Sequence, residues 1–232
     1  MIQLRRSAER GHARHGWLES YHTFSFAGYY DPGFMGFRAL RVINQDRVAP
    51  GRGFGLHPHD NMEIISYVLE GAIEHRDTMG SRSVLRPGEV QVISAGTGMA
   101  HSEYNPSDTE PLHFLQIWIV PNAENLEPTY QQRAFPLEAR RNRLRLVCSP
   151  DGRDGSTVLR QDASAYACVL EPGHQVAHQF RQGRYGWVHV ARGAVDLNGQ
   201  RLEDGDGAAI ADEPVLTLRG DRDAELLLFD LP

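Results

Sequence analysis

The chain has 232 residues, of which 41% are hydrophobic, a size that suits one large all-β domain or two small ones with a substantial core. Its formal net charge of −6 repels a phosphate backbone, so we expect no direct nucleic-acid binding. The N-terminus has no apolar stretch of signal-peptide length, and the longest apolar run, LHFLQIWIV, is too short and too polar to span a bilayer. We therefore expect a cytoplasmic monomer without a membrane partner. Cys148 and Cys168 lack metal-binding spacing and are expected to be reduced core thiols.

Short apolar or alternating runs follow one another along the chain. Gly, Pro, Asn and Asp separate them about every ten residues, which is typical of an antiparallel sandwich or barrel. No segment sustains the 3.6-residue period of a helix, so the pattern predicts an all-β fold. The predicted strands lie within residues 36–44, 63–71, 72–80, 83–96, 112–121, 144–150, 166–173, 186–193, 194–210, 215–220 and 224–232.

The weakest strand pattern lies at residues 122–142, where prolines and charges predict a connection with a short helical turn. We place the domain boundary there, giving an N-terminal domain of residues 1–135 and a C-terminal domain of residues 136–232. Both halves run strand, Gly-marked turn, strand and a second turn into a further strand, but the pattern alone leaves open whether this is a duplication or chance. The basic stretch at residues 139–145 lacks interleaved aromatic residues and is expected to be a solvated linker face.

Two short stretches, HPHDNME at residues 57–63 and HSEYN at residues 101–105, carry the chemistry. If the first is one regular strand, side-chain alternation puts His57, His59 and Glu63 on the same face, and His101 and Glu103 also share a face. Imidazole and carboxylate groups suit a divalent transition metal and leave positions open for other ligands. For any single histidine among the 11, a polar residue on a solvent face is the better interpretation. For the combined spacing, a metal site is favoured.

The spacing also resembles the two cupin motifs. Gly51, the HxHx3E pattern and Gly71 match the first motif, while Gly88 through GTGMAHSEYN matches the second, with Asn105 in place. One extra residue precedes Gly71, and the proline usual before the second motif's glycine is absent. More specifically, HTFSFAGYYDPGFMGFRALRVINQD, GFGLHPHDNMEIISYVLEG and SAGTGMAHSEYN resemble the pirin family, and within it the bacterial pirin-like quercetin 2,3-dioxygenases, from about Leu4 to the C-terminus.

This resemblance implies an all-β bicupin, with two jelly-roll-type β-barrels and one metal in the N-terminal barrel. It assigns the ligands to His57, His59, His101 and Glu103, and leaves Glu63 as an alternative ligand or as a residue that orients a histidine. One divalent ion per chain is expected, Fe(II), although the ligand types also permit Mn, Co, Ni, Cu or Zn.

The C-terminal half is expected to bind no metal. His178 stands near the position equivalent to His57, but Phe180 replaces the next ligand and nothing like HSE follows. The histidines outside the site are expected to have structural or surface roles: His12, His15, His22, His75, His113, His174, His178 and His189.

The resemblance implies a dioxygenase that cleaves quercetin or a related flavonol and releases carbon monoxide, with flavonol and dioxygen as small-molecule partners. Glu103 is the expected general base for the flavonol 3-hydroxyl, and Glu63 takes that role if Glu103 binds the metal tightly. The alternative is an iron-dependent binding module that regulates a protein partner. An enzyme requires a mainly apolar cavity of roughly 300–1,000 Å³ at the metal, whereas a binding module needs only a convex charged patch. No GxSxG elbow, GxGxxG fingerprint or P-loop is present.

Overall fold

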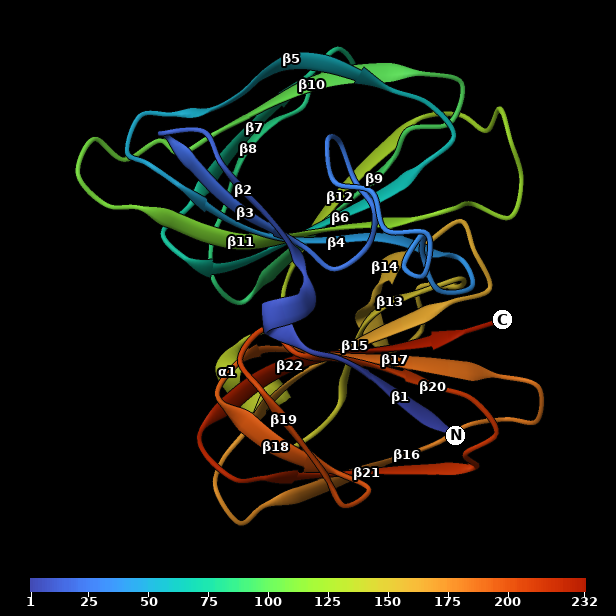
Figure 1. Ribbon diagram of the computed structural model, residues 1–232. Coiled ribbons are helices and arrows are strands. Elements are labelled where there is room, and N and C mark those ends of the chain that lie inside the picture. The colour runs from blue at the N-terminus through green and yellow to red at the C-terminus, as the bar shows by residue number, and fades with distance from the viewer.

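The computed structural model describes residues 1–232 and folds them into two β-barrel halves, one above the other in Figure 1. Each half contains a seven-stranded sheet and a four-stranded sheet, which confirms the predicted all-β bicupin. Helical structure is limited to three short pieces, none of which is long and apolar enough to cross a membrane. These pieces are η1 (Ser7–Glu9), α1 (Leu137–Arg140) and η2 (Arg153–Gly155).

The upper half in Figure 1 holds the N-terminal strands. Its large sheet has the order β12-β9-β6-β11-β4-β3-β2, and its small sheet has the order β5-β10-β7-β8. The strands are β2 (Gly11–Arg14), β3 (Leu18–His22), β4 (Leu40–Val48), β5 (Gly53–His59), β6 (Glu63–Glu70), β7 (Ile73–Asp77), β8 (Arg82–Leu85), β9 (Glu89–Ser94), β10 (Met99–Tyr104), β11 (Leu112–Ile119) and β12 (Thr129–Ala134).

The lower half holds the remaining strands and also the first strand of the chain. Its large sheet has the order β1-β20-β17-β22-β15-β13-β14, and its small sheet has the order β16-β21-β18-β19. The strands are β1 (Ile2–Arg5), β13 (Arg145–Ser149), β14 (Thr157–Val158), β15 (Ser164–Leu170), β16 (Gln175–Gln179), β17 (Tyr185–Arg192), β18 (Ala194–Leu197), β19 (Gln200–Glu203), β20 (Gly207–Ile210), β21 (Val215–Gly220) and β22 (Ala224–Leu231).

The two halves share one topology. Strands β4 to β11 pair among themselves in the same order as β15 to β22, so the repeated plan expected from the sequence is present in the fold. The edge position that β12 occupies beside β9 is filled in the lower half by β1 beside β20. The N-terminal strand therefore completes the C-terminal half, whereas the boundary near residue 135 stays a prediction.

The large sheets of the two halves pack against each other, which explains their continuous apolar runs. On β6, for example, Ile65 and Tyr67 face the contact between the halves and Val68 faces the barrel interior. A cluster of 23 buried apolar residues, including Trp187 of β17, spans the contact. Both cysteines are free and buried, as expected. Residues on the other face of the same N-terminal strands are left to build the barrel interior.

The connecting segment differs from expectation at two points, residues 129–134 and Arg140, while Arg141 and Arg143 of the basic stretch are exposed as expected. Residues 129–134 form β12 because they pair with β9 of the large sheet, although the helical turn α1 is present. Within the basic stretch, Arg140 is buried instead of solvated: it donates to the Glu225 carboxylate at 2.9 Å and to the Tyr67 hydroxyl at 2.6 Å. This network ties the connection to both halves, because Tyr67 lies on β6 and Glu225 on β22.

Candidate metal centre

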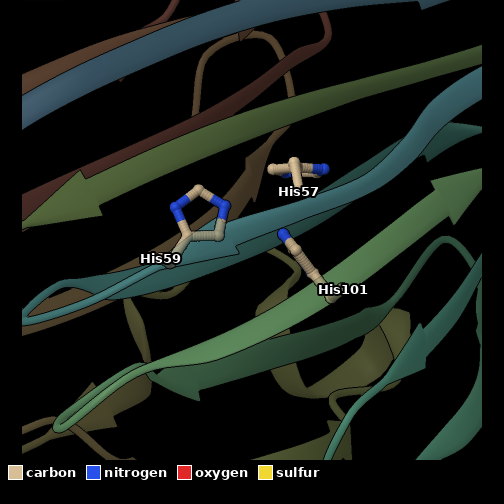
Figure 2. Close-up of side chains that lie close together, drawn as sticks. All are labelled: His57, His59 and His101. Atoms are coloured by element: carbon tan, nitrogen blue, oxygen red, sulfur yellow. The ribbon is translucent and has the colours of Figure 1, made fainter.

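Three histidines converge inside the N-terminal barrel. His57 and His59 lie on β5 and His101 lies on the neighbouring strand β10, directly opposite His57 in the strand register. Their potential ligand nitrogens all lie within 4.8 Å of one another, and Figure 2 shows the three rings gathered around a common space. The structure thus brings together the three histidines singled out by their spacing.

The ring nitrogens fit a metal. His59 Nε2 and His101 Nε2 are buried and have no hydrogen-bond partner, a costly arrangement for a polar atom unless it binds something. His57 Nδ1 donates to the Gly55 carbonyl at 2.7 Å, which leaves Nε2 as its free lone pair. Burial, reinforced by the neighbouring imidazoles, lowers the pKa of His101 to about 2 and that of His59 to about 4. These two rings are therefore neutral at pH 7, the form that binds a divalent ion.

A close approach of β5 to β10 positions these side chains. The strand register shifts between His101 and Glu103, so that Glu103 lies opposite Phe54. At Gly53, a Cβ atom would lie 2.2 Å from the Glu103 carbonyl oxygen, so only glycine permits this spacing. The GRGFG stretch thus allows tight strand contact beside the histidines.

Glu103 is buried next to the three histidines but is held by other partners. Its carboxylate accepts hydrogen bonds from Gln116 Nε2 at 2.8 Å and Ser66 Oγ at 3.2 Å. Burial, with a smaller effect from the Asp46 charge, raises the pKa of Glu103 to about 7. A Glu103 carboxylate oxygen lies within 4.8 Å of ring nitrogens of His101 and His75. Glu103 does not line the adjacent cavity, whereas its partner Gln116 does.

His75 is a site residue that sequence reasoning missed. It is fully buried on β7, opposite Glu103 in the strand register, instead of having a remote structural or surface role. Its Nδ1 lies 3.4 Å from His101 Nδ1, and its Nε2 lies 2.9 Å from the Asp77 carboxylate. The alternation of Ile73, His75 and Asp77 along one strand could have indicated an inward position, although no ligand spacing marks it.

The structure places Glu63 away from the three histidines. The expectation that it shares a strand face with His59 was wrong, because the chain turns at Asn61 (φ 44°) and Glu63 starts β6 in the other sheet. The Glu63 carboxylate accepts hydrogen bonds from Ser94 Oγ at 2.8 Å and from the Arg160 backbone N–H at 3.0 Å. Its contacts therefore link the two halves.

A cavity of about 620 Å³ opens beside His57 and His59. Most of its lining surface is apolar, as expected for an enzyme site, although only seven of its seventeen lining residues are hydrophobic. Sequence reasoning missed the polar part of its wall, since those residues carry no motif spacing. The aromatic lining residues are Phe26, Tyr29, Phe54 and Trp118; the polar ones beyond the two ligand histidines include Ser20, His22, Asn44, Asp46 and Gln116.

The corresponding region of the C-terminal barrel is packed. His178 bonds to Asp230 through Nε2 at 2.8 Å, and its ring lies edge-on to Phe180. A cluster of 16 buried apolar residues, including Phe180, fills the interior. Both groups of three or more potential metal ligands lie in the N-terminal half.

A histidine cluster beside a cavity, inside one barrel of a duplicated cupin fold, defines a metal-binding bicupin. The Pirin family model matches residues 3–119, and the model described as the quercetinase C-terminal cupin domain matches residues 146–231. The chain belongs to the pirin family, which confirms the resemblance found in its motifs.

Individual relatives align with this chain over nearly its full length. Quercetin 2,3-dioxygenase from Escherichia coli K12 is 53% identical over 232 residues, covering 100% of this chain and 99% of that protein. A pirin-like protein from Caulobacter vibrioides is 41% identical over 231 residues, covering 99% of each. The crystal structure of the bacterial pirin YhhW from Escherichia coli in complex with nickel(II) is 52% identical, with a TM-score of 0.95 and coverage of 100% and 99%.

Proposed function

We propose that this protein is a metal-dependent dioxygenase that cleaves quercetin or a related flavonol with release of carbon monoxide. The observation that carries the proposal is the set of unpartnered imidazole nitrogens beside a cavity of about 620 Å³. That volume lies within the range of small-molecule sites, roughly 300–1,000 Å³. The name of the Escherichia coli relative, quercetin 2,3-dioxygenase, supports the choice of reaction.

The proposed ligands for one divalent ion are His57, His59, His101 and Glu103. When bound, the ion would supply Lewis-acid stabilisation of the flavonol anion. Fe(II) is our proposal for the native metal, and the nickel(II) complex of the relative supports binding of a first-row divalent ion.

The chain's own residues have three proposed tasks. Aromatic side chains such as Phe54 and Trp118 would bind the flat substrate rings and exclude water from the reacting centre. Glu103 would accept the proton of the flavonol 3-hydroxyl, and its raised pKa near 7 suits a base that works at neutral pH. Gln116 lines the cavity and donates to Glu103, which does not line it, so this role requires the carboxylate to exchange its bond to Gln116 for one to the substrate.

The alternative, an iron-dependent binding module for a protein partner, needs no internal cavity. The cavity beside the histidines therefore supports the enzyme.

Metal dependence of flavonol turnover tests the proposal. The metal-free protein should leave quercetin absorbance unchanged in aerobic buffer, and added divalent metal should start its decay together with carbon monoxide release. A chelator should stop both. Absence of flavonol decay with every first-row divalent metal, in protein shown to bind the ion, would reject the proposed activity.

A further inference from the structure

The polar wall of the cavity is a block of four side chains on two neighbouring strands. Ser20 and His22 lie on β3, and Asp46 and Asn44 lie opposite them on β4 in the strand register. All four are at most 5% exposed and line the cavity. Because alternate residues of a strand share a face, all four project to the same side of the sheet.

Hydrogen bonds within this wall fix which of its atoms remain free. Ser20 Oγ donates to Asp46 Oδ1, and His22 Nδ1 donates to Asn44 Oδ1 at 2.9 Å. A neutral imidazole that donates through Nδ1 has a bare lone pair on Nε2. Burial keeps His22 neutral by lowering its pKa. The hydrogen bonds of the two side chains use only His22 Nδ1 and Asp46 Oδ1, which leaves His22 Nε2 and Asp46 Oδ2 without a partner, and both residues line the cavity.

Burial raises the pKa of Asp46 to about 7, so its free oxygen accepts a hydrogen bond in the carboxylate form and donates one in the protonated form, whereas neutral His22 accepts through Nε2. The complementary ligand therefore needs groups that both donate and accept, and a purely apolar ligand would leave two polar groups unpaired. Four aromatic side chains, Phe26, Tyr29, Phe54 and Trp118, also line the cavity, which favours a flat ring. Phenolic hydroxyl groups on an aromatic ring satisfy both requirements.

A chain of aromatic contacts connects this wall to the histidine cluster. His59 lies edge-on to Trp118 with ring centroids 5.1 Å apart, Trp118 contacts Phe26 at 5.3 Å, and Phe26 contacts His22 at 5.4 Å. The wall and the candidate metal ligands therefore face one continuous aromatic-lined space. A multi-ring ligand anchored at the histidines can extend along these rings toward His22.

We infer that His22 and Asp46 form a recognition site for the hydroxyl groups of the substrate ring that lies away from the metal, so that the protein selects flavonols with a hydroxylated pendant ring. This inference rests on the proposed function, because the orientation assumes that the flavonol 3-hydroxyl lies at the metal. Ser20 and Asn44 are positioning residues that orient Asp46 and His22.

Binding of matched flavonols to the nickel(II)-loaded protein, without oxygen, tests the inference. Quercetin carries a catechol as its pendant ring, whereas galangin carries an unsubstituted phenyl ring and is otherwise identical. Since each hydroxyl would form a hydrogen bond with a buried polar side chain, the wild type should bind quercetin roughly 10- to 100-fold more tightly than galangin. Equal affinities in the wild type would overturn the inference.

Two substitutions test whether Asp46 and His22 cause the difference in affinity between quercetin and galangin. Asp46→Asn is nearly isosteric, and His22→Phe keeps a ring against Phe26; each should lower the quercetin-to-galangin affinity ratio toward one, mainly by weakening quercetin. His12→Gln is the matched control, since His12 lines the same cavity outside the wall and should leave the ratio unchanged. If both wall variants fold and retain the wild-type ratio, the inference is wrong.

The same proteins in aerobic buffer separate this inference from the proposed function. If the wall variants cleave quercetin and retain the wild-type quercetin-to-galangin affinity ratio, the proposed activity is supported and hydroxyl recognition is rejected. If the affinity ratio depends on Asp46 and His22 but the protein cleaves no flavonol, hydroxyl recognition is supported and the proposed activity is rejected.

Discussion

His75 and His101 face each other through their Nδ1 atoms, 3.4 Å apart, and the Asp77 carboxylate lies 2.9 Å from the far nitrogen of His75. Asp77 is itself fixed by the backbone N–H groups of Met79 and Ser81, both at 2.9 Å. The row Asp77–His75–His101 therefore orients His101, whose Nε2 points toward the other two histidines (Figure 2).

Replacing His75 by Phe should weaken metal binding roughly 10- to 100-fold, because the orienting partner of a ligand histidine is lost. The Phe ring can retain the packing against Tyr130, so the fold should survive. Competition with a chelator of known affinity measures the change. Wild-type affinity in a folded His75→Phe protein would show that His75 does not position His101.

The three converging histidines should each be needed for metal. Changing His57, His59 or His101 to Ala removes one donor and should bring the metal content well below one ion per chain. The fold should persist, since the apolar contact between the halves does not involve the ion. Elemental analysis with circular dichroism checks both points, and the exposed His174→Ala is the control. Full occupancy in all three variants would exclude this site.

Glu103→Gln tests the proposed base. Gln has nearly the same shape but cannot take up the proton as a carboxylate does, so the turnover rate constant should fall by roughly 10²–10⁴. Metal content must be measured in the same samples because an amide is a poorer ligand. Undiminished turnover in metal-replete protein would remove Glu103 from the mechanism.

Acid should destabilise the contact between the halves. Burial lowers the pKa of His113 and His189 to about 3, and neither His189 nitrogen has a partner. Below pH 6.5 these two histidines become protonated in the unfolded chain, whereas they stay neutral in the folded protein. Their contribution to the free energy of unfolding is therefore fully present above pH 6.5 and is lost as the pH falls toward 3.

Chemical denaturation at several pH values measures this effect. Between pH 7 and pH 5, wild type should lose about 2 kcal/mol more unfolding free energy than His189→Leu. The exposed His174→Gln should follow the wild type. Parallel pH profiles for wild type and His189→Leu would contradict the assignment.

Local patterns predict this fold and this site to different extents. The strands and the HxH spacing follow from side-chain alternation, which a single segment contains. The place of Glu63 could not be obtained that way, because the turn at Asn61 moves the next residues into another sheet. His75 and Asp46 reach the barrel interior only through the pairing of distant strands, and β1 joins the C-terminal half for the same reason.

Oxygen labelling tests the central claim most directly. Metal-reconstituted protein should convert quercetin under dioxygen labelled with oxygen-18 into equal amounts of carbon monoxide and a ring-opened depside. A dioxygenase places both labelled atoms in the depside, because the carbon monoxide leaves with the carbon and oxygen already present in the flavonol. Mass spectrometry of the depside together with carbon monoxide quantification should show this outcome. Quercetin loss without carbon monoxide, or a depside that lacks the label, would contradict the account.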